Sequence, residues 1–386
     1  MRIFVLGTGA TGSLIAQLLV RQGHQVVCGD RNPDRARRFL GRKSRIPIRP
    51  VNARNLWSIV KAARGMHLVV NAGPAFLNKI VMRAALRLRA HYLDMASHQA
   101  NNPFHAEQLR FHKQFVAKNR AAVINAGVAP GLTNLLVARS ADLLDGLDTV
   151  QIRLYESTGS DEPVSQWSSD AAFDEAVSRP PVYRNDRFRL GKRFGERERF
   201  RFPRPIGLAG VMLAAQDEVV TLPRFLKLRE VDVKIGGNDF ERLRRLYRQG
   251  KLRKSSGPGA SRFPQTPTPR QLAKLLARGA LYHARFAASV VAHGRKGERH
   301  ATARFDAAFP SLRQIRSREV YTSPIAWATA HMAALFVKHF PRTVPGVHPP
   351  EALPAKARQA ILAGARAYGI SVRQRLSLQE VIDDEE

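Results

Sequence analysis

Cysteine is almost absent from this sequence of 386 residues. The single cysteine, Cys28, lies in an apolar run beside Val26 and Val27. One cysteine excludes an intramolecular disulfide and any cysteine-rich metal site, and this composition is typical of a reducing compartment. We therefore expect a cytoplasmic protein.

Long uncharged apolar runs are also missing. Nowhere do about 18 apolar residues follow one another without a charge, which is the length that a membrane-spanning helix requires. The apolar start, Met1 to Leu6, runs directly into glycines rather than into a signal-peptide pattern. The sequence predicts neither a signal peptide nor a membrane partner.

Metal-ligand patterns are lacking among the histidines. The twelve histidines form no helical pairs with carboxylates at ligand spacing, and the run His348-Pro349-Pro350-Glu351 contains too much proline to present two ligands on a helix. The sequence predicts no metal site.

Acidic residues are scarce, since 31 Asp and Glu stand against 63 Lys and Arg and leave a net charge of +32. Such a field can attract nucleic acid or anionic lipid. The excess, however, is mostly arginine, is scattered along the chain and lacks the interleaved aromatics of a base-stacking surface. We favour a solvated surface whose field draws in an anionic cofactor or substrate, with specific nucleic-acid binding as the alternative.

The chain is long enough for two lobes, because single hydrophobic cores stop growing near roughly 250–300 residues. In its first part, short apolar runs alternate with helical patterns, which predicts a doubly wound parallel sheet of the Rossmann type. The predicted strands are Arg2 to Leu6, Gln25 to Cys28, Ile48 to Val51, Leu68 to Val70, Tyr92 to Met95 and Ala122 to Asn125. The predicted helices follow Gly12, span about Phe76 to Arg89 and span about Phe104 to Lys118.

The pattern changes after Asn125. A turn at Gly127 to Gly131 and a helix at Leu132 to Leu144 lead into strand-like runs and two basic stretches, which predict an inserted α+β domain with a mixed sheet. The apolar run Ile325 to Phe340 predicts a helix that returns to the first domain. The predicted division is 1–126 with about 320–370 for dinucleotide binding, 127–319 for substrate binding and dimerisation, and 371–386 for a C-terminal tail.

A glycine-rich loop separates the first predicted strand from the first predicted helix. In a dinucleotide fold, three glycines allow the tight turn, the approach of the pyrophosphate and close packing of helix on strand, and the helix N-terminus favours the phosphates. The pattern therefore predicts nicotinamide dinucleotide binding. The residues of this loop are Gly7, Thr8, Gly9, Ala10, Thr11 and Gly12.

An acidic residue, Asp30, ends the second predicted strand about twenty residues further on, as the fingerprint requires. A carboxylate there accepts hydrogen bonds from the adenosine ribose and repels a 2′-phosphate, which favours NAD. The adjacent Arg31 can pair with a 2′-phosphate or stack on adenine. NAD is slightly favoured, and NADP stays open.

Several motifs together resemble the saccharopine dehydrogenase-like family, and within it the lysine 6-dehydrogenases most. Besides the glycine loop, the resemblance rests on these runs: Asn71-Ala72-Gly73-Pro74, His91-Tyr92-Leu93-Asp94, Gly127 to Asn134, Asp217 to Pro223 and Pro345 to Glu351. The resemblance implies a Rossmann domain interrupted by a substrate and dimerisation domain, a nicotinamide cofactor, a homodimer, and oxidation or reduction at a C–N bond of an amino acid (lysine or saccharopine class) or polyamine.

The sequence departs from this family in places. Some relatives carry an aspartate where this chain has Ala129, so a carboxylate role is absent there. Asn52, commonly aspartate in relatives, is predicted to touch adenine. The segment Leu208 to Gln216 matches lysine 6-dehydrogenases poorly, which leaves the substrate open.

Residues at strand ends are the other site candidates, because doubly wound sheets bind ligands at the carboxyl edge. Asp94, at the end of the predicted strand Tyr92 to Met95, and His98, just after it, are candidate catalytic residues, with a capping carboxylate and a loop histidine as the alternatives. Glu218 is a third candidate, reaching the substrate amine from the second lobe. Further cofactor contacts are predicted for Asn71, Ala72, Pro74, Pro130 and Gly131.

The leading hypothesis is an NAD(P)-dependent dehydrogenase or reductase acting on CH–NH or CH–NH2 donors. A catalytically silent NAD(P)-binding regulator or scaffold is the main alternative, because the turn lacks its carboxylate. Another oxidoreductase on the same fold is also consistent with the sequence.

Overall fold

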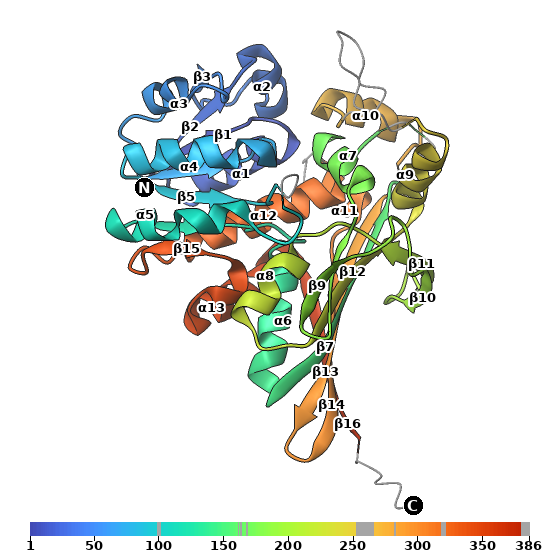
Figure 1. The fold of residues 1–386 in the computed structure, drawn as a ribbon. Helices are drawn as coiled ribbons and strands as arrows, with labels where there is room; N and C mark the ends of the chain where they lie inside the picture. The colour runs from blue at the N-terminus through green and yellow to red at the C-terminus, as the bar shows by residue number, and fades with distance from the viewer. Residues whose placement is uncertain are drawn as a thin grey trace, which may run out of the picture.

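The computed structural model describes residues 1–379 except 99–101, 161, 163, 167–168, 252–265, 282 and 318–321. Two lobes stand side by side, each built on one large sheet (Figure 1). The glycine- and serine-rich run at 254–261 and the acidic end at 383–386 lie outside the described residues.

The first lobe contains a seven-stranded sheet in which every neighbouring pair is parallel, in the order β15-β6-β5-β4-β1-β2-β3. This confirms the predicted Rossmann-type sheet. Its strands are β1 (Arg2–Leu6), β2 (Gln25–Asp30), β3 (Ile48–Pro50), β4 (Leu68–Asn71), β5 (His91–Asp94), β6 (Ala121–Val123) and β15 (Gly346–His348). Its early helices are α1 (Ala10–Arg21), α2 (Pro33–Leu40), α3 (Leu56–Ala62), η1 (Ala75–Leu77), α4 (Asn78–Arg87), η2 (Glu107–Phe111) and α5 (His112–Ala117).

The C-terminal part of the chain returns to the first lobe. Helix α12 (Pro324–Lys338) packs along α1, and its five alanines let the two helices approach closely. It is followed by β15, η3 (Pro350–Ala352), α13 (Ala355–Ala365) and η4 (Arg366–Tyr368). The predicted apolar helix over 325–340 is therefore present and covers the Rossmann sheet.

The second lobe contains a nine-stranded sheet whose main path is β10-β11-β12-β7-β13-β14-β16, with β8 and β9 attached beside β12. Strands β7 and β12 are parallel and their other neighbours are antiparallel, so the predicted mixed sheet is confirmed. Its strands are β7 (Gly146–Ser157), β8 (Pro181–Arg184), β9 (Arg187–Leu190), β10 (Glu198–Arg201), β11 (Leu208–Leu213), β12 (Glu230–Gly236), β13 (Arg285–Lys296), β14 (Arg299–Ala308) and β16 (Ser371–Gln379). Its helices are α6 (Leu132–Leu143), α7 (Ser169–Val177), α8 (Glu218–Phe225), α9 (Asn238–Arg248), α10 (Pro269–Ala277) and α11 (Leu312–Arg316).

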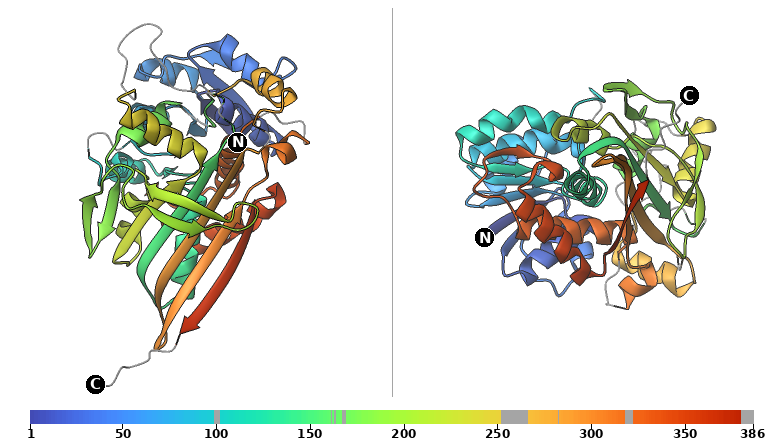
Figure 2. Two further views of the ribbon diagram at one scale, coloured as in Figure 1. Left: turned by 90° about the vertical axis from the view of Figure 1, so that its right-hand side faces the viewer. Right: turned by 90° about the horizontal axis from the view of Figure 1, so that it is seen from below.

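Helix α6 joins the two lobes. Seen from below, it lies end-on between the Rossmann lobe and the mixed sheet (Figure 2). Its Leu132, Leu135 and Leu136 are buried in one hydrophobic cluster that also contains strand residues of both sheets. The lobes therefore share a core, which fixes the polar groups at the junction relative to the Rossmann sheet.

Residues Ser371–Gln379, which the sequence analysis assigned to a tail, form β16 at the sheet edge. They pair antiparallel with the whole of β14, from Ser371 opposite Ala308 to Gln379 opposite His300. All nine residues are exposed, so no alternation of buried and exposed side chains marks this strand in the sequence. Its position is set by backbone hydrogen bonds to the edge of β14. The strand thus depends on long-range pairing rather than on a local pattern.

None of the helices in the described part of the chain combines the length and apolar character that a bilayer crossing requires. Across the same residues, no group of three or more His, Cys, Asp or Glu side chains is arranged to hold a metal ion. Cys28 is fully buried, and burial raises the pKa of its thiol to about 12.

Candidate functional site

The glycine loop turns at the carboxyl end of β1. Gly7 has φ of +89°, and a Cβ there would lie 2.7 Å from the Gly73 nitrogen, while one at Gly12 would lie 1.9 Å from the Gly7 oxygen. A Cβ at Gly9, by contrast, would meet nothing within 4 Å. Two glycines are therefore required by packing inside the protein, whereas the space beside Gly9 is open for a ligand.

Gly9 is the N-cap of α1, where no side chain caps the helix and the first turn carries no acidic residue. The backbone N–H groups at this end are left without side-chain acceptors, and the helix dipole favours negative charge there. The loop residues Thr8, Ala10 and Thr11 line the same turn. This arrangement fits the pyrophosphate of a dinucleotide.

Asp30 supports this loop from β2. One carboxylate oxygen accepts the Thr8 N–H at 2.8 Å and the other accepts the Asn32 N–H at 2.9 Å. The carboxylate thus joins the loop after β1 to the loop after β2. Arg31 follows it with an exposed side chain. The predicted adenosine-binding pair lies at the carboxyl edge of the sheet, as the fingerprint requires.

Asn71 is buried at the end of β4 and holds the next loop together. Its side chain donates to Asn78 Oδ1 at 2.8 Å and accepts the Gly73 N–H at 3.1 Å. Ala72 lies against the position where a Cβ of Gly12 would stand. Pro74 is the N-cap of η1. Asn71 positions the strand-end loop through internal bonds, and this loop is adjacent to the glycine loop.

Asn52 lies on the surface after β3. Its side-chain oxygen accepts the Arg54 N–H at 3.1 Å, and its own N–H donates to Ser58 Oγ at 3.0 Å. The guanidinium of Arg54 stacks on Phe76 with its carbon 5.8 Å from the ring centroid. Asn52, which was predicted to contact adenine, therefore lies in an exposed turn, where its side-chain oxygen and its backbone N–H already form local hydrogen bonds.

The turn Gly127 to Gly131 links β6 to α6. It contains a cis peptide bond between Ala129 and Pro130, and Gly131 has φ of +134°. A Cβ at Gly131 would lie 2.0 Å from the Gly127 oxygen, so the turn requires glycine. The Gly131 N–H donates to Asn134 Oδ1 at 2.9 Å. The turn is a rigid connection between the Rossmann sheet and the junction helix.

Asp94 is buried at the end of β5 and accepts three hydrogen bonds. They come from the Tyr92 hydroxyl at 2.9 Å, from Gln108 at 3.1 Å and from the Asn125 N–H at 2.9 Å. Burial raises the pKa of Asp94 to about 7, against the lowering effect of these donors. The carboxylate ties the end of β5 to the segment that follows β6, and its predicted catalytic role stays a prediction.

His98 is half-buried beyond β5, and its ring meets the edge of Phe76 with the centroids 6.4 Å apart. It thus lies over the loop that follows β4. Next to it, the Ser97 N–H donates to Asp217 Oδ2 of the second lobe at 2.7 Å, and the Ser97 hydroxyl donates to Asn125 Oδ1 at 2.8 Å. The two lobes therefore meet at the strand end that carries Asp94 and His98.

Glu218, the first residue of α8, is completely buried at the junction. One carboxylate oxygen accepts the Thr133 hydroxyl at 2.7 Å, and the other has no hydrogen bond within the described residues. Burial raises the pKa of Glu218 to about 7, with Asp217 and Glu351 contributing further. Its environment is that of a proton acceptor or donor near neutral pH.

Glu351, on η3, is a second buried carboxyl at the junction. It accepts Asn134 Nδ2 at 3.0 Å, while its other oxygen lacks a hydrogen bond within the described part of the chain. Burial raises the pKa of this group to about 7 as well. We call Thr133, Asn134, Glu218, Thr221 and Glu351 the junction network; Asn134 Nδ2 lies 3.4 Å from Thr221 Oγ1 within it.

The sequence analysis did not single out most partners of these groups. It missed Tyr92, Ser97 as a backbone donor, Gln108, Asn125, Thr133, Asn134, Asp217, Thr221 and Glu351. Six of these residues lay inside quoted motifs, which was the available signal: Tyr92, Thr133, Asn134, Asp217, Thr221 and Glu351. Ser97, Gln108 and Asn125 lay outside them, and the proximity of all nine depends on the tertiary fold.

Comparisons with known proteins agree with this geometry. Residues 3–128 match the family model described as the saccharopine dehydrogenase NADP binding domain. The carboxynorspermidine synthase of Vibrio cholerae is 29% identical over 119 residues, which is 28% of this chain and 28% of that protein.

Among solved structures, apo saccharopine dehydrogenase (L-Glu forming) from Saccharomyces cerevisiae superposes with a TM-score of 0.68 at 12% identity, covering 97% of this chain and 99% of the yeast chain. These matches confirm the resemblance to the saccharopine dehydrogenase family that the motifs indicated, whereas the nearer likeness to lysine 6-dehydrogenases stays a prediction. Residues 3–128 thus match a saccharopine dehydrogenase NADP binding domain, and the whole chain has the same fold as the yeast saccharopine dehydrogenase.

Proposed function

We propose that this chain is a dehydrogenase or reductase that transfers hydride at the C–N bond of an amino acid (lysine or saccharopine class) or a polyamine, with NAD or NADP as cofactor. The single observation that carries the proposal is the set of buried carboxyls at the lobe junction. Glu218 and Glu351 form no ion pair with a basic side chain within the described residues, in a chain with a net charge of +32.

A third carboxyl, Glu175 on α7, extends this acidic region. It accepts Gln216 Nε2 at 2.6 Å, and burial together with the charge of Glu156 raises its pKa well above the usual range. A cationic amine is the chemical class that such groups would bind, because it supplies the charge that they lack. This complementarity supports an amine substrate.

Proton transfer is the second requirement of amine oxidation. The amine must be neutral before hydride leaves its carbon, so a group with a pKa near 7 has to accept the ammonium proton. The free oxygen of Glu218 is suited to this role, since its other oxygen is fixed by Thr133. Glu351 would help to hold the second ammonium group of a diamine or of a diamino acid such as lysine.

The residues of the first lobe fit a nicotinamide cofactor. The open space at Gly9 and the uncapped start of α1 would hold the pyrophosphate, and Asp30 would meet the adenosine ribose. When bound, the cofactor supplies the hydride acceptor or donor. We favour NAD slightly over NADP, because the Asp30 carboxylate would repel a 2′-phosphate, whereas the exposed Arg31 would attract it.

The test is to titrate the purified protein with NADH and NADPH and then to follow cofactor absorbance with lysine, saccharopine and diamines in both directions. Turnover with one of these amines supports the proposal. Tight cofactor binding without turnover on any of them would replace it with the silent regulatory function, and absence of binding would refute both. A light-scattering measurement of molar mass in the same preparation tests the homodimer, which stays a prediction.

A further inference from the structure

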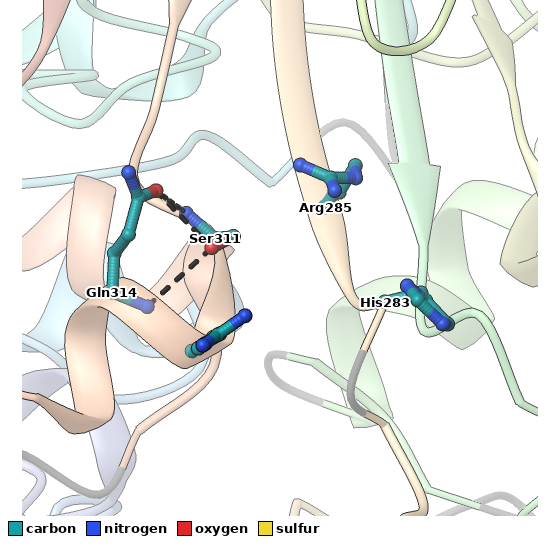
Figure 3. A pocket seen from close by; sticks show the side chains of 5 residues that line it. His283, Arg285, Ser311 and Gln314 are labelled. Atoms are coloured by element: carbon teal, nitrogen blue, oxygen red, sulfur yellow. Dashed lines mark hydrogen bonds between the residues drawn. The ribbon is translucent and has the colours of Figure 1, made fainter.

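A pocket of about 420 Å³ lies in the second lobe, apart from the residues of the junction network. Its wall combines the loop before β13, the first residue of β13 and the start of α11 (Figure 3). The side chains that line it are His283, Arg285, Ser311, Arg313 and Gln314. None of these described lining residues carries a carboxylate.

The walls of this pocket are held by a small hydrophobic cluster. Leu312 of α11 packs with Leu281 and with leucines of α10, and its N–H points to the Ala284 oxygen at 3.5 Å. On the other side, a Cβ at Gly159 would lie 2.8 Å from the His283 Cβ, so the loop after β7 lies directly against the pocket. The pocket is therefore formed by packed elements rather than by one surface loop.

Ser311 and Gln314 are fixed by each other. The Ser311 N–H donates to Gln314 Oε1 at 2.8 Å and its hydroxyl donates to the same oxygen at 3.1 Å, as Figure 3 shows. Because Oε1 is engaged, the side-chain N–H groups of Gln314 are the ones left to donate to a ligand. This wall of the pocket thus offers hydrogen-bond donors.

Arg285 is the residue of this pocket whose charge is left uncompensated by the described residues. Its side chain is partly buried, yet it has no hydrogen bond, ion pair or ring contact with any described residue. Three other partly buried arginines of this lobe have acidic partners: Arg184 pairs with Asp232, Arg244 with Glu241 and Arg304 with Asp306. Removing a guanidinium from water without giving it a hydrogen-bond acceptor costs free energy. Two oxygens of one carboxylate or phosphate offset this cost best, because they accept two parallel N–H bonds.

We propose that this pocket binds a small oxyanion, with Arg285 as the principal ligand and the side-chain N–H groups of Gln314 as further donors. Its volume suits a carboxylate or a phosphate monoester rather than a dinucleotide or a polymer. The shared chemistry is a compact anion with two or three oxygens on one centre. This site is independent of the proposed oxidoreductase function.

The experiment is isothermal titration of the full chain with inorganic phosphate and, separately, with succinate, without cofactor or amine. Arg285→Gln is compared with Arg295→Gln, which removes an exposed arginine at the opposite end of the same strand. We expect saturable binding of at least one probe that weakens about 10-fold or more in Arg285→Gln and is unchanged in Arg295→Gln. Thermal melts of both variants confirm that the fold is kept, and Arg285→Lys serves as a second variant if Arg285→Gln does not fold.

Binding of phosphate alone identifies a phosphate ester site, and binding of succinate alone identifies a carboxylate site. The proposal is overturned if neither probe saturates, or if Arg295→Gln weakens binding as much as Arg285→Gln, because the general positive field would then account for it. Since no turnover is measured, failure of this proposal and failure of the proposed reaction are separate results.

Discussion

The glycine loop of the first lobe and the junction network between the lobes offer ligands groups of opposite electrostatic character. The loop offers backbone N–H groups and an open space at Gly9, with no ionisable side chain in the turn itself. The network offers buried side-chain carboxyls, Glu218 and Glu351, each with one oxygen that lacks a hydrogen bond in the described structure. The first arrangement suits an anionic ligand and the second a cationic one, as the proposed cofactor and the proposed amine substrate require.

The largest effect is expected inside the glycine loop, where two glycines differ in what surrounds them. Gly7→Ala forces a Cβ against the Gly73 backbone at positive φ and should lower the free energy of unfolding by about 3 kcal/mol or more. Gly9→Ala meets open space at an ordinary φ of −85° and should change it by less than about 1 kcal/mol.

The two variants are compared by urea denaturation and by titration with NADH. Gly9→Ala should keep its stability and still bind the cofactor about 10-fold or more weakly, because the added methyl group occupies the phosphate position. Unchanged NADH affinity in Gly9→Ala would show that the pyrophosphate lies elsewhere.

The junction network is tested by Glu218→Gln, which keeps the shape and the acceptor for Thr133 but removes the proton acceptor. Turnover of the amine substrate should fall about 10²–10⁴-fold at saturating substrate, while NADH affinity stays the same. Glu351→Gln is the matched control, since it removes an equally buried carboxyl and should act mainly on the KM of a doubly charged substrate. An unchanged kcat in Glu218→Gln would exclude its role in proton transfer.

A smaller effect is expected on stability as a function of pH. The pKa values of Asp94, Glu218 and Glu351 are raised to about 7 by burial, from ordinary values of 3.8 for Asp and 4.5 for Glu. The folded state therefore binds these protons more tightly than the unfolded state. Their stabilising contribution is complete below about pH 4 and is lost as the pH rises through about 7.

Urea denaturation at pH 5 and pH 8 measures this dependence. The free energy of unfolding should decrease by a few kcal/mol between the two values, since one pKa unit corresponds to about 1.4 kcal/mol. The double variant Glu218→Gln, Glu351→Gln should flatten the slope. A stability that increases over this range in the double variant and the natural chain alike would contradict the raised pKa values.

The smallest effect concerns the contact between the lobes at Ser97. Asp217→Asn weakens a charge-assisted bond of 2.7 Å to the Ser97 N–H and should lower the free energy of unfolding by about 1 kcal/mol. Asp148→Asn, at an exposed position at the start of the lobe, should leave it unchanged. Equal stability of the two variants would show that the Ser97 contact is not a significant link between the lobes.

Local sequence patterns were sufficient to predict structure where all the residues of a motif lie in one short segment of the chain. The strand, glycine loop, helix and Asp30 of the first βαβ unit were predicted because their spacing is set within about thirty residues of chain. The strand β16 was missed, because all its side chains are exposed and only the unpaired edge of β14 selects it. Asp94 was predicted as a candidate, yet the donors that surround it come from β5, η2 and the turn after β6.

The sequence by itself therefore determined the parallel sheet, the mixed second sheet, the dinucleotide loop and the family of the first 128 residues, since each follows from local periodicity or from a compact motif. Only the tertiary structure decided that Glu218 and Glu351 share one buried network, that Asp217 meets Ser97, and that Arg285 lines a pocket in the second lobe. The physical reason is that desolvation and hydrogen-bond partners depend on which distant segments pack together, and no short stretch of sequence encodes that packing.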